Sequence, residues 1–383
     1  MTKHLRNLAL AIMSSLAAPL LAAEPVTLTA FGDAAGIRGF GIHGEQNRDW
    51  VASGLKGVER LRSDINFLNL EASLTRRCRR YMKKSYQFSM GPKTLQQFAK
   101  WGFNLFGLAN NHTIDCLSPF PANESVAVQS SLQRQYPRAR FHGIAKTLAR
   151  LQKPAVVKVR GLRVGMVSMK AWANPRAWPL ASLGNKDLVL QALADADVDV
   201  RVLSLHGGEE NARTPTPLMR NIAREFLAKY NGDVVLGHHS HTMQGYEVVR
   251  KSNGRVGAIF YSLGNFLHNG LSKRGDGKAV RLAFTKVGLT GVQIVPLAGA
   301  SHAPSMTSGS GLEKLQRILR TNHRHLSRHP LPSGLTKLKA SERSVRRPFP
   351  HIEVRPPAPM LSRKSGIPGS FRLPAVQGRV PIP

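Results

Sequence analysis

Six polar residues whose side chains suit metal coordination follow apolar segments of the sequence. They are Asp33, Glu71, Asn111, His206, His239 and His241. Carboxylates, an amide oxygen and imidazoles suit a divalent ion such as Mn, Fe or Zn, and one carboxylate can bridge two ions. One or two such ions would activate a water and stabilise the oxygens of an in-line displacement. His112 follows Asn111 directly and is the candidate acid that would protonate a leaving oxygen.

Each pattern has an ordinary structural alternative when it is taken alone. Asn110-Asn111-His112 can form a plain turn, because Asn tolerates left-handed backbone geometry. Gly264-Asn265 after an apolar segment is also typical of a turn. The joint occurrence of polar residues after several apolar segments is what favours a functional site.

The apolar segments before these residues predict strands, and helical patterns lie between them. The predicted strands cover residues 26–31, 65–70, 104–109, 162–167, 200–205, 233–236 and 258–261. Residues 94–101 and 216–230 have the apolar spacing of helices; in the second, Thr216 suits the N-cap, Pro217 the first turn and Asn231-Gly232 the end. Alternating strands and helices predict an α/β domain. Ligands of such domains bind at the carboxyl ends of the strands, where the candidate ligands lie.

The two ends of the chain differ in composition from the part between them. Lys3 and Arg6 precede an apolar run over 8–21 that closes with small residues, which predicts a signal peptide over 1–23 and an exported protein, periplasmic or associated with the cell envelope. An uncleaved N-terminal anchor is the alternative. Residues 330–383 hold 11 of the 24 prolines, so we expect 301–383 to be a basic, Pro-rich tail, largely extended or disordered. The predicted domain therefore covers 24–300.

Cysteine content and net charge limit the class of protein further. Two cysteines among 383 residues exclude a disulfide-built scaffold and a Cys-rich zinc site. Export would let Cys78 and Cys116 form a disulfide, and two separate thiols are the alternative. The net charge of +33 favours an anionic partner, either an acidic polymer or the membrane or envelope surface. A nucleic-acid partner is disfavoured, because the chain has a leader and no helix-turn-helix or aromatic-rich motif.

The order of these motifs resembles that of the bacterial capsule-synthesis CapA proteins, which are associated with poly-γ-glutamate. The shared motifs are Gly32-Asp33, Asn69-Leu70-Glu71, Ala109-Asn110-Asn111-His112-Thr113-Ile114-Asp115, His206-Gly207-Gly208-Glu209-Glu210, Gly237-His238-His239-Ser240-His241 and Tyr261-Ser262-Leu263-Gly264-Asn265-Phe266. The resemblance covers about residues 26–298. It implies a four-layer α/β/β/α sandwich of the calcineurin-like metallophosphoesterase type, with two metals at the strand ends.

The resemblance also implies roles for individual residues. The six residues named first would be metal ligands and His112 the acid, with a supporting set of Asn110, Asp115, Glu210, His238 and Asn265. One departure concerns the superfamily's first motif, Asp-x-His, because Asp33 is followed here by Ala34-Ala35. One ligand is therefore missing or supplied from elsewhere in the chain.

These observations predict an exported CapA-like protein that acts in the biosynthesis or handling of a capsule polymer such as poly-γ-glutamate. Its positive charge would attract the acidic polymer. The strand-end site would be a metal-dependent hydrolytic centre, and polymer handling without hydrolysis stays open. The alternative function is that of a periplasmic metal-dependent phosphoesterase.

Overall fold

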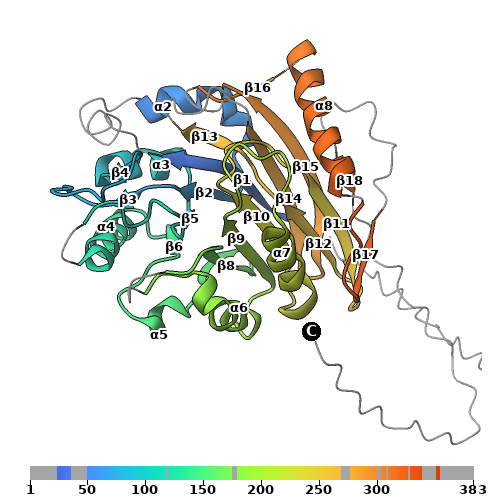
Figure 1. Ribbon diagram of the computed structural model, residues 1–383, viewed down its shortest axis with the longest axis horizontal. Coiled ribbons are helices and arrows are strands. Elements are labelled where there is room, and N and C mark those ends of the chain that lie inside the picture. The colour runs from blue at the N-terminus through green and yellow to red at the C-terminus, as the bar shows by residue number, and fades with distance from the viewer. Residues whose placement is uncertain are drawn as a thin grey trace, which may run out of the picture.

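Two β-sheets form the centre of the protein, as the computed structural model shows (Figure 1). The structure describes residues 24–35, 50–117, 120–174, 179–268, 277–299, 303–307, 309–326, 328–338 and 351–353. The predicted signal peptide over 1–23 lies outside these ranges, as do residues 354–383 of the predicted tail. Among the described segments, no helix has the length and apolar character needed to cross a membrane.

The first sheet has nine strands and contains the predicted strands that end in Asp33, Glu71 and Asn111. Its strands are β1 (Val26–Ala35), β2 (Ile65–Leu70), β5 (Leu105–Gly107), β6 (Arg140–His142), β13 (Asn265–His268), β14 (Gly277–Thr285), β15 (Gly288–Ala298), β16 (Ser305–Met306) and β18 (His351–Glu353). The order is β16-β15-β14-β1-β2-β5-β6, with β13 paired to β1 and β18 to β15. The strands β1, β2, β5 and β6 run parallel, so their carboxyl ends reach the same edge.

The second sheet has seven strands and contains the predicted strands before the histidine motifs. Its strands are β7 (Ala155–Val159), β8 (Leu162–Lys170), β9 (Val200–His206), β10 (Val234–His238), β11 (Tyr246–Lys251), β12 (Val256–Phe260) and β17 (Leu335–Lys337). The order is β17-β11-β12-β10-β9-β8-β7, and β8, β9, β10 and β12 are parallel. A separate pair, β3 (Ser73–Leu74) and β4 (Ser89–Met90), lies outside both sheets.

Alternate residues of the central strands contribute to two different hydrophobic clusters. Leu28 of β1 belongs to the same cluster as Val234 and Leu236 of β10, which shows that this cluster fills the space between the sheets. Phe31 and Val235 point the other way and pack in the outer cluster with residues of the helices. Because side chains of a strand alternate between its faces, each sheet is covered on both sides. The layers are therefore α/β/β/α, the sandwich that the motif order implied.

Helices cover the outer faces of the two sheets (Figure 1). They are α2 (Trp50–Leu55), α3 (Pro92–Trp101), α4 (Pro121–Gln135), α5 (Leu148–Leu151), α6 (Lys186–Ala194), α7 (Pro217–Lys229) and α8 (Gly309–Leu326), with 3-10 turns η1 (Lys56–Leu61) and η2 (Leu183–Asn185). Helix α3 packs on the first sheet, where the rings of Trp101 and Phe31 lie 5.8 Å apart. Helices α6 and α7 pack on the second sheet. The predicted N-cap of α7 is confirmed, because the Thr216 hydroxyl accepts a hydrogen bond from the Met219 amide.

Part of the range 301–383, which the sequence predicts to be a tail, is described by the structure and packs on the two sheets. Helix α8 lies between 301 and 383 and packs on β11 and β15, and β17 extends the second sheet beside β11. Leu326 at the end of α8 is buried, and the Arg224 guanidinium donates a hydrogen bond to the Pro330 carbonyl. For residues 339–350 and 354–383, which lie outside the described residues, the extended basic tail stays a prediction.

Candidate metal centre

The candidate ligands come together at the carboxyl edge of both sheets. Asp33 of β1 is in register with Asn69 of β2 and with Asn265 of β13. In the second sheet, His206 at the end of β9 is in register with His238 at the end of β10. Parallel pairing thus gathers residues that are far apart in the sequence.

Among the described residues, three groups of side chains are close enough to hold a metal ion, and two of them share one carboxylate. Glu71 forms the first group with His206 and His239, and the second with His241 and His268. Glu210, His239 and His241 form the third group, in which Glu210 is exposed. Within each group the ligand atoms lie within 4.8 Å of one another. A carboxylate shared between two histidine pairs is a donor set that suits a divalent metal ion.

Glu71 is the central residue of this site. Its side chain is fully buried, and neither carboxylate oxygen accepts a hydrogen bond from a described residue. The nearest imidazole nitrogens are Nε2 of His206, 3.5 Å from Oε1, and Nε2 of His268, 3.4 Å from Oε2. A buried carboxylate that accepts no hydrogen bond is disfavoured unless a nearby cation compensates its charge. The donor set therefore fits a divalent metal ion.

His239 and His241 lie in a loop with unusual backbone geometry. Their φ angles are 90° and 55°, in the left-handed region that residues with a side chain rarely adopt. Nδ1 of His239 is buried without a partner, whereas Nδ1 of His241 lies 2.9 Å from Oδ1 of Asn265. Backbone strain of this kind is typical of functional sites, where surrounding contacts enforce it.

Asp33 lies beside the ligand groups, and its oxygens are engaged with protein donors. Oδ1 accepts hydrogen bonds from Nδ2 of Asn69 at 2.9 Å and from Nδ1 of His238 at 2.7 Å, and Oδ2 accepts one from the His239 amide at 2.9 Å. Burial would raise the pKa of Asp33, but His238 and other imidazoles lower it to about 2. Asp33 thus fixes the loop that carries His239, and its Oδ2 is still 3.7 Å from Nδ1 of His241.

Asn111 joins the first ligand group through His206. Its Oδ1 lies 2.8 Å from Nε2 of His206, the nitrogen that also faces Glu71. Asn110 supports this turn: its Nδ2 donates to the Leu70 carbonyl and its Oδ1 accepts from the His112 amide. Of the two predicted asparagines, Asn111 therefore lies in the site, and Asn110 stabilises the turn that carries Asn111.

His112 borders the site and is oriented by two charged residues. Its Nδ1 lies 2.6 Å from Oδ2 of Asp115 and 3.1 Å from Nζ of Lys84, which itself pairs with Asp115 at 2.5 Å. Its Nε2 is 3.9 Å from Oε1 of Glu71. With a proton of Nδ1 shared with Asp115, Nε2 is the atom free to exchange a proton. A cavity of about 130 Å³ lies next to it and is lined by Tyr86, Phe88, His112, Glu210, Asn211, His241 and His268.

The electrostatics of the site favour ionised carboxylates and neutral imidazoles in the first ligand group. Burial opposes the charge of Glu71, but His241 and His206 hold its pKa well below its usual range. Burial lowers the pKa of His206, and burial together with His206 lowers that of His239 to about 3. For His241 burial would lower the pKa, but Glu71 and Asp33 raise it. Metal ligands must be deprotonated, so the first group is in the state that binding requires.

His268 is the residue of this site that sequence reasoning missed. It ends the short strand β13 and is in register with Ala35 of β1. Ala35 is the position at which the Asp-x-His motif would have its histidine. An imidazole from the neighbouring strand therefore enters the same region, which makes His268 a candidate for the missing ligand. The signal was a histidine three residues after Asn265, at the end of a motif that was already recognised.

The fold and the histidine-rich strand ends define a class of protein, an α/β/β/α sandwich with a candidate metal centre. Within it, the chain belongs to the family described as bacterial capsule synthesis protein PGA_cap, whose model matches residues 27–270. A search of curated proteins finds no match. The solved structures similar to the chain include a novel phosphatase from Mycoplasma pneumoniae, at 11% identity over 71% of this chain and 93% of that one, with a TM-score of 0.45. A hypothetical protein from Thermus thermophilus is similar at 15% identity, over 70% of this chain and 98% of that one, with a TM-score of 0.41.

Proposed function

We propose that the protein is an exported metal-dependent hydrolase that acts on an acidic capsule polymer, of the poly-γ-glutamate kind, at the cell envelope. The observation that carries this proposal is Glu71, a buried carboxylate without hydrogen bonds between two pairs of histidines. Membership of a capsule-synthesis family supports the biological role. The net charge of +33 supports an acidic partner, because positive surface charge attracts and orients polyanions.

In this proposal the residues of the site have three different roles in hydrolysis: metal binding, positioning and proton donation. Glu71, His206 and His239 would hold one ion, and Glu71, His241 and His268 the other. Ions bound there would polarise the substrate and lower the pKa of a bound water. Asp33 keeps the His239 loop in position. His112, oriented by Asp115, would donate a proton from Nε2 to the leaving atom.

A periplasmic phosphoesterase is the second candidate function, and the size of the cavity favours it. About 130 Å³ beside His112, His241 and His268 admits a single small group more readily than a folded stretch of polymer. The same ligand groups would serve phosphoryl transfer to water, since paired ions stabilise both the attacking and the leaving oxygen. Substrate assays separate the two candidates.

The test starts with metal content. The mature chain, grown with Mn, Fe and Zn, is compared with a His239→Ala, His241→Ala double variant by elemental analysis, and both are assayed on poly-γ-glutamate and on an aryl phosphodiester. We expect bound metal and turnover in the parent and loss of both in the double variant. His142→Ala is the matched control, because this buried histidine hydrogen-bonds the Leu151 carbonyl and Ser168 outside the site. A metal-replete parent that turns over neither substrate would contradict the proposal.

A further inference from the structure

The segment over residues 76–83 carries a concentration of positive charge, and none of its cationic side chains forms an ion pair in the described structure. Its cationic residues are Arg76, Arg77, Arg79, Arg80 and Lys83. All five are exposed, and none of their side chains takes part in a described hydrogen bond or ion pair. Like charges this close repel one another, so the arrangement has a cost in folding free energy. A cost without a compensating contact inside the chain suggests a compensating ligand.

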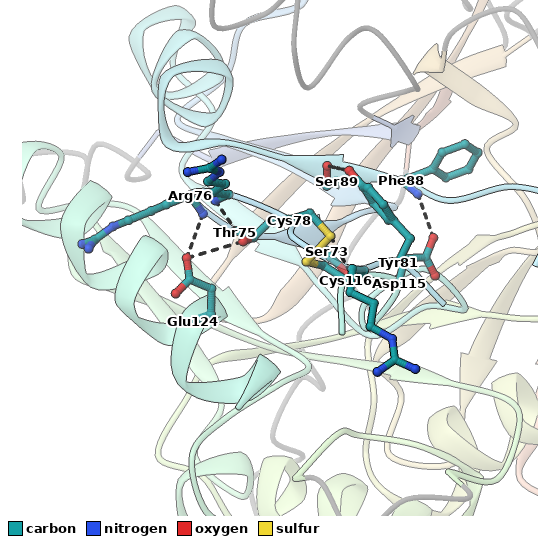
Figure 2. The surroundings of a disulfide bond; sticks show 12 residues. Ser73, Thr75, Arg76, Cys78, Tyr81, Phe88, Ser89, Asp115, Cys116 and Glu124 are labelled. Carbon is teal, nitrogen blue, oxygen red and sulfur yellow. Dashed lines mark hydrogen bonds between the residues drawn. A yellow bond between two sulfur atoms is a disulfide. The ribbon is translucent and has the colours of Figure 1, made fainter. Parts of the chain in front are cut away.

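A disulfide fixes this cationic segment to the rest of the domain. Cys78 is bonded to Cys116, 38 residues away, so the pairing that the sequence left open does form (Figure 2). Backbone hydrogen bonds on both sides reinforce it: the Leu117 amide donates to the Arg80 carbonyl at 2.7 Å and the Met82 amide to Asp115 at 2.8 Å. The segment is thus held in one conformation despite its charge, which lowers the entropy lost when it binds a partner.

A cleft runs along the same segment. Its volume is about 360 Å³, and it is lined by Thr75, Arg76, Arg77, Arg79, Cys116, Leu117 and Glu124. Glu124 is the one acidic residue of this lining, and its Oε1 accepts hydrogen bonds from the backbone amide of Arg76 at 2.8 Å and from the Thr75 hydroxyl at 3.5 Å (Figure 2). The guanidinium groups around the cleft stay available for a ligand with negative charges.

The cleft is linked to the metal centre by the chain itself. Cys116 directly follows Asp115, the residue that orients His112. At the other end of the segment, Nζ of Lys84 contacts Nδ1 of His112 at 3.1 Å and the Asn111 carbonyl at 3.0 Å. A polymer held along the cationic segment would therefore lie close to the residues that border the candidate centre.

We propose that residues 76–83, fixed by the Cys78–Cys116 disulfide, form a binding site for a polycarboxylate chain that is separate from the metal ligands. The inference rests on the proposed function and names where its acidic substrate binds. A guanidinium pairs with a carboxylate through two parallel hydrogen bonds, so a row of arginines on a rigid segment matches successive acidic groups along a polymer. A long substrate held here needs only its reacting group to enter the 130 Å³ cavity.

A second basic cavity supplies the matched control. It has a volume of about 650 Å³, and Lys146, Arg150 and Lys153 are among its lining residues. Changing these three to Gln removes the same charge as Arg76→Gln, Arg77→Gln and Arg79→Gln. This cavity is not bordered by the disulfide or by the ligand candidates.

The experiment measures binding of fluorescent poly-γ-glutamate to the full chain by anisotropy at two salt concentrations. We expect the Arg76, Arg77 and Arg79 triple variant to bind at least about tenfold more weakly and with a shallower salt dependence, since several charge-assisted pairs are lost. The Lys146, Arg150 and Lys153 variant should change affinity by less than about twofold. Equal losses in both variants would show a net-charge effect and overturn the site, as would tighter binding of polyphosphate than of poly-γ-glutamate.

The role of the disulfide is tested by reducing it in the folded chain. We expect affinity for poly-γ-glutamate to fall toward that of the arginine variant while bound metal is retained, because the segment loses its tether. Unchanged affinity in the reduced chain, or in a folded Cys78→Ser, Cys116→Ser variant, would overturn that role. Binding needs no turnover, so a chain that binds the polymer and hydrolyses nothing would leave this inference standing and remove the proposed function.

Discussion

The protein buries charged side chains in two kinds of surroundings, and these differ in how the charge is satisfied. In the first, Asp233 pairs with Lys251 at 3.0 Å and with Arg255 at 3.3 Å, and Glu247 pairs with Arg224 at 2.5 Å while accepting a hydrogen bond from Tyr261. In the second, Glu71 is as deeply buried and accepts no hydrogen bond. Both occur in the same α/β/β/α sandwich.

This difference indicates that the paired carboxylates stabilise the fold, whereas Glu71 is available to bind a ligand. A buried carboxylate is tolerated when donors or cations surround it, and removing one partner then destabilises the fold. The pairs of Asp233 and Glu247 meet this requirement from within the chain. Glu71 has only imidazole nitrogens at 3.4 to 3.9 Å around it, and none of them makes a hydrogen bond to it in the described structure. The charges of Asp233 and Glu247 are paired within the chain, whereas Glu71 lies in a donor set that could hold a metal ion.

The largest effect expected from this comparison is that of Glu71→Gln. It removes the carboxylate common to both ligand groups, so bound metal should fall to less than about a tenth of the parent value. Turnover should be lost with it. Elemental analysis and circular dichroism of the same sample separate loss of metal from loss of fold. A variant that keeps its metal would show that Glu71 is not a metal ligand.

A smaller effect on the same measurement is expected from His268→Ala. The first ligand group, with His206 and His239, stays intact, so we expect about half of the bound metal to remain. Full metal content in this variant would show that the imidazole opposite Ala35 does not replace the missing histidine. Complete loss would mean that the two groups cannot be filled independently.

Glu247→Gln should lower the free energy of unfolding and leave bound metal unchanged, which is the reverse of the effect expected of Glu71→Gln. Arg224 would keep its charge in a buried position with its carboxylate partner gone, which costs about 3–5 kcal/mol of the free energy of unfolding. Urea denaturation measures this loss. Metal content of the folded variant should match the parent, because Glu247 contacts none of the ligand groups. Metal loss together with unchanged stability would show that Glu247 serves the metal site rather than the fold.

The sequence revealed the parts of this molecule that depend on local pattern. The strands before Glu71 and His239 were predictable because central parallel strands, buried on both faces, are rich in apolar residues, as the fully buried strands β2 and β10 show. His268 was not, because its ligand position depends on the pairing of a four-residue strand with β1 across a register shift. The role of Asp33 was also hidden, since hydrogen bonds from His238 and the His239 amide exist only once the two sheets meet. Nor could composition distinguish α8 from a tail, because its contacts with β11 and β15 are tertiary.

The smallest effect concerns two buried lysines, one with a carboxylate partner and one without. Lys251 pairs with Asp233, whereas Lys278 is fully buried and hydrogen-bonds the Gln244 carbonyl, and burial lowers its pKa from 10.5 to about 7. Between pH 7 and 10.5 the unfolded chain holds a proton at Lys278 that the folded chain has lost. The free energy of unfolding should therefore rise with pH across this window, by up to about 1.4 kcal/mol per unit, and Lys278→Met should flatten the rise.

Thermal melts of the parent and of Lys278→Met at several pH values check this expectation. Lys251→Met is the control, and it should destabilise the fold at neutral pH because Asp233 loses a buried partner. A pH profile that Lys278→Met leaves unchanged would mean that Lys278 is charged in the folded chain. No carboxylate pairs with Lys278 in the described structure, so its charge would then be held by hydrogen bonds such as that to the Gln244 carbonyl. A buried cation would in that case not need an opposite charge beside it, unlike the buried carboxylates compared above.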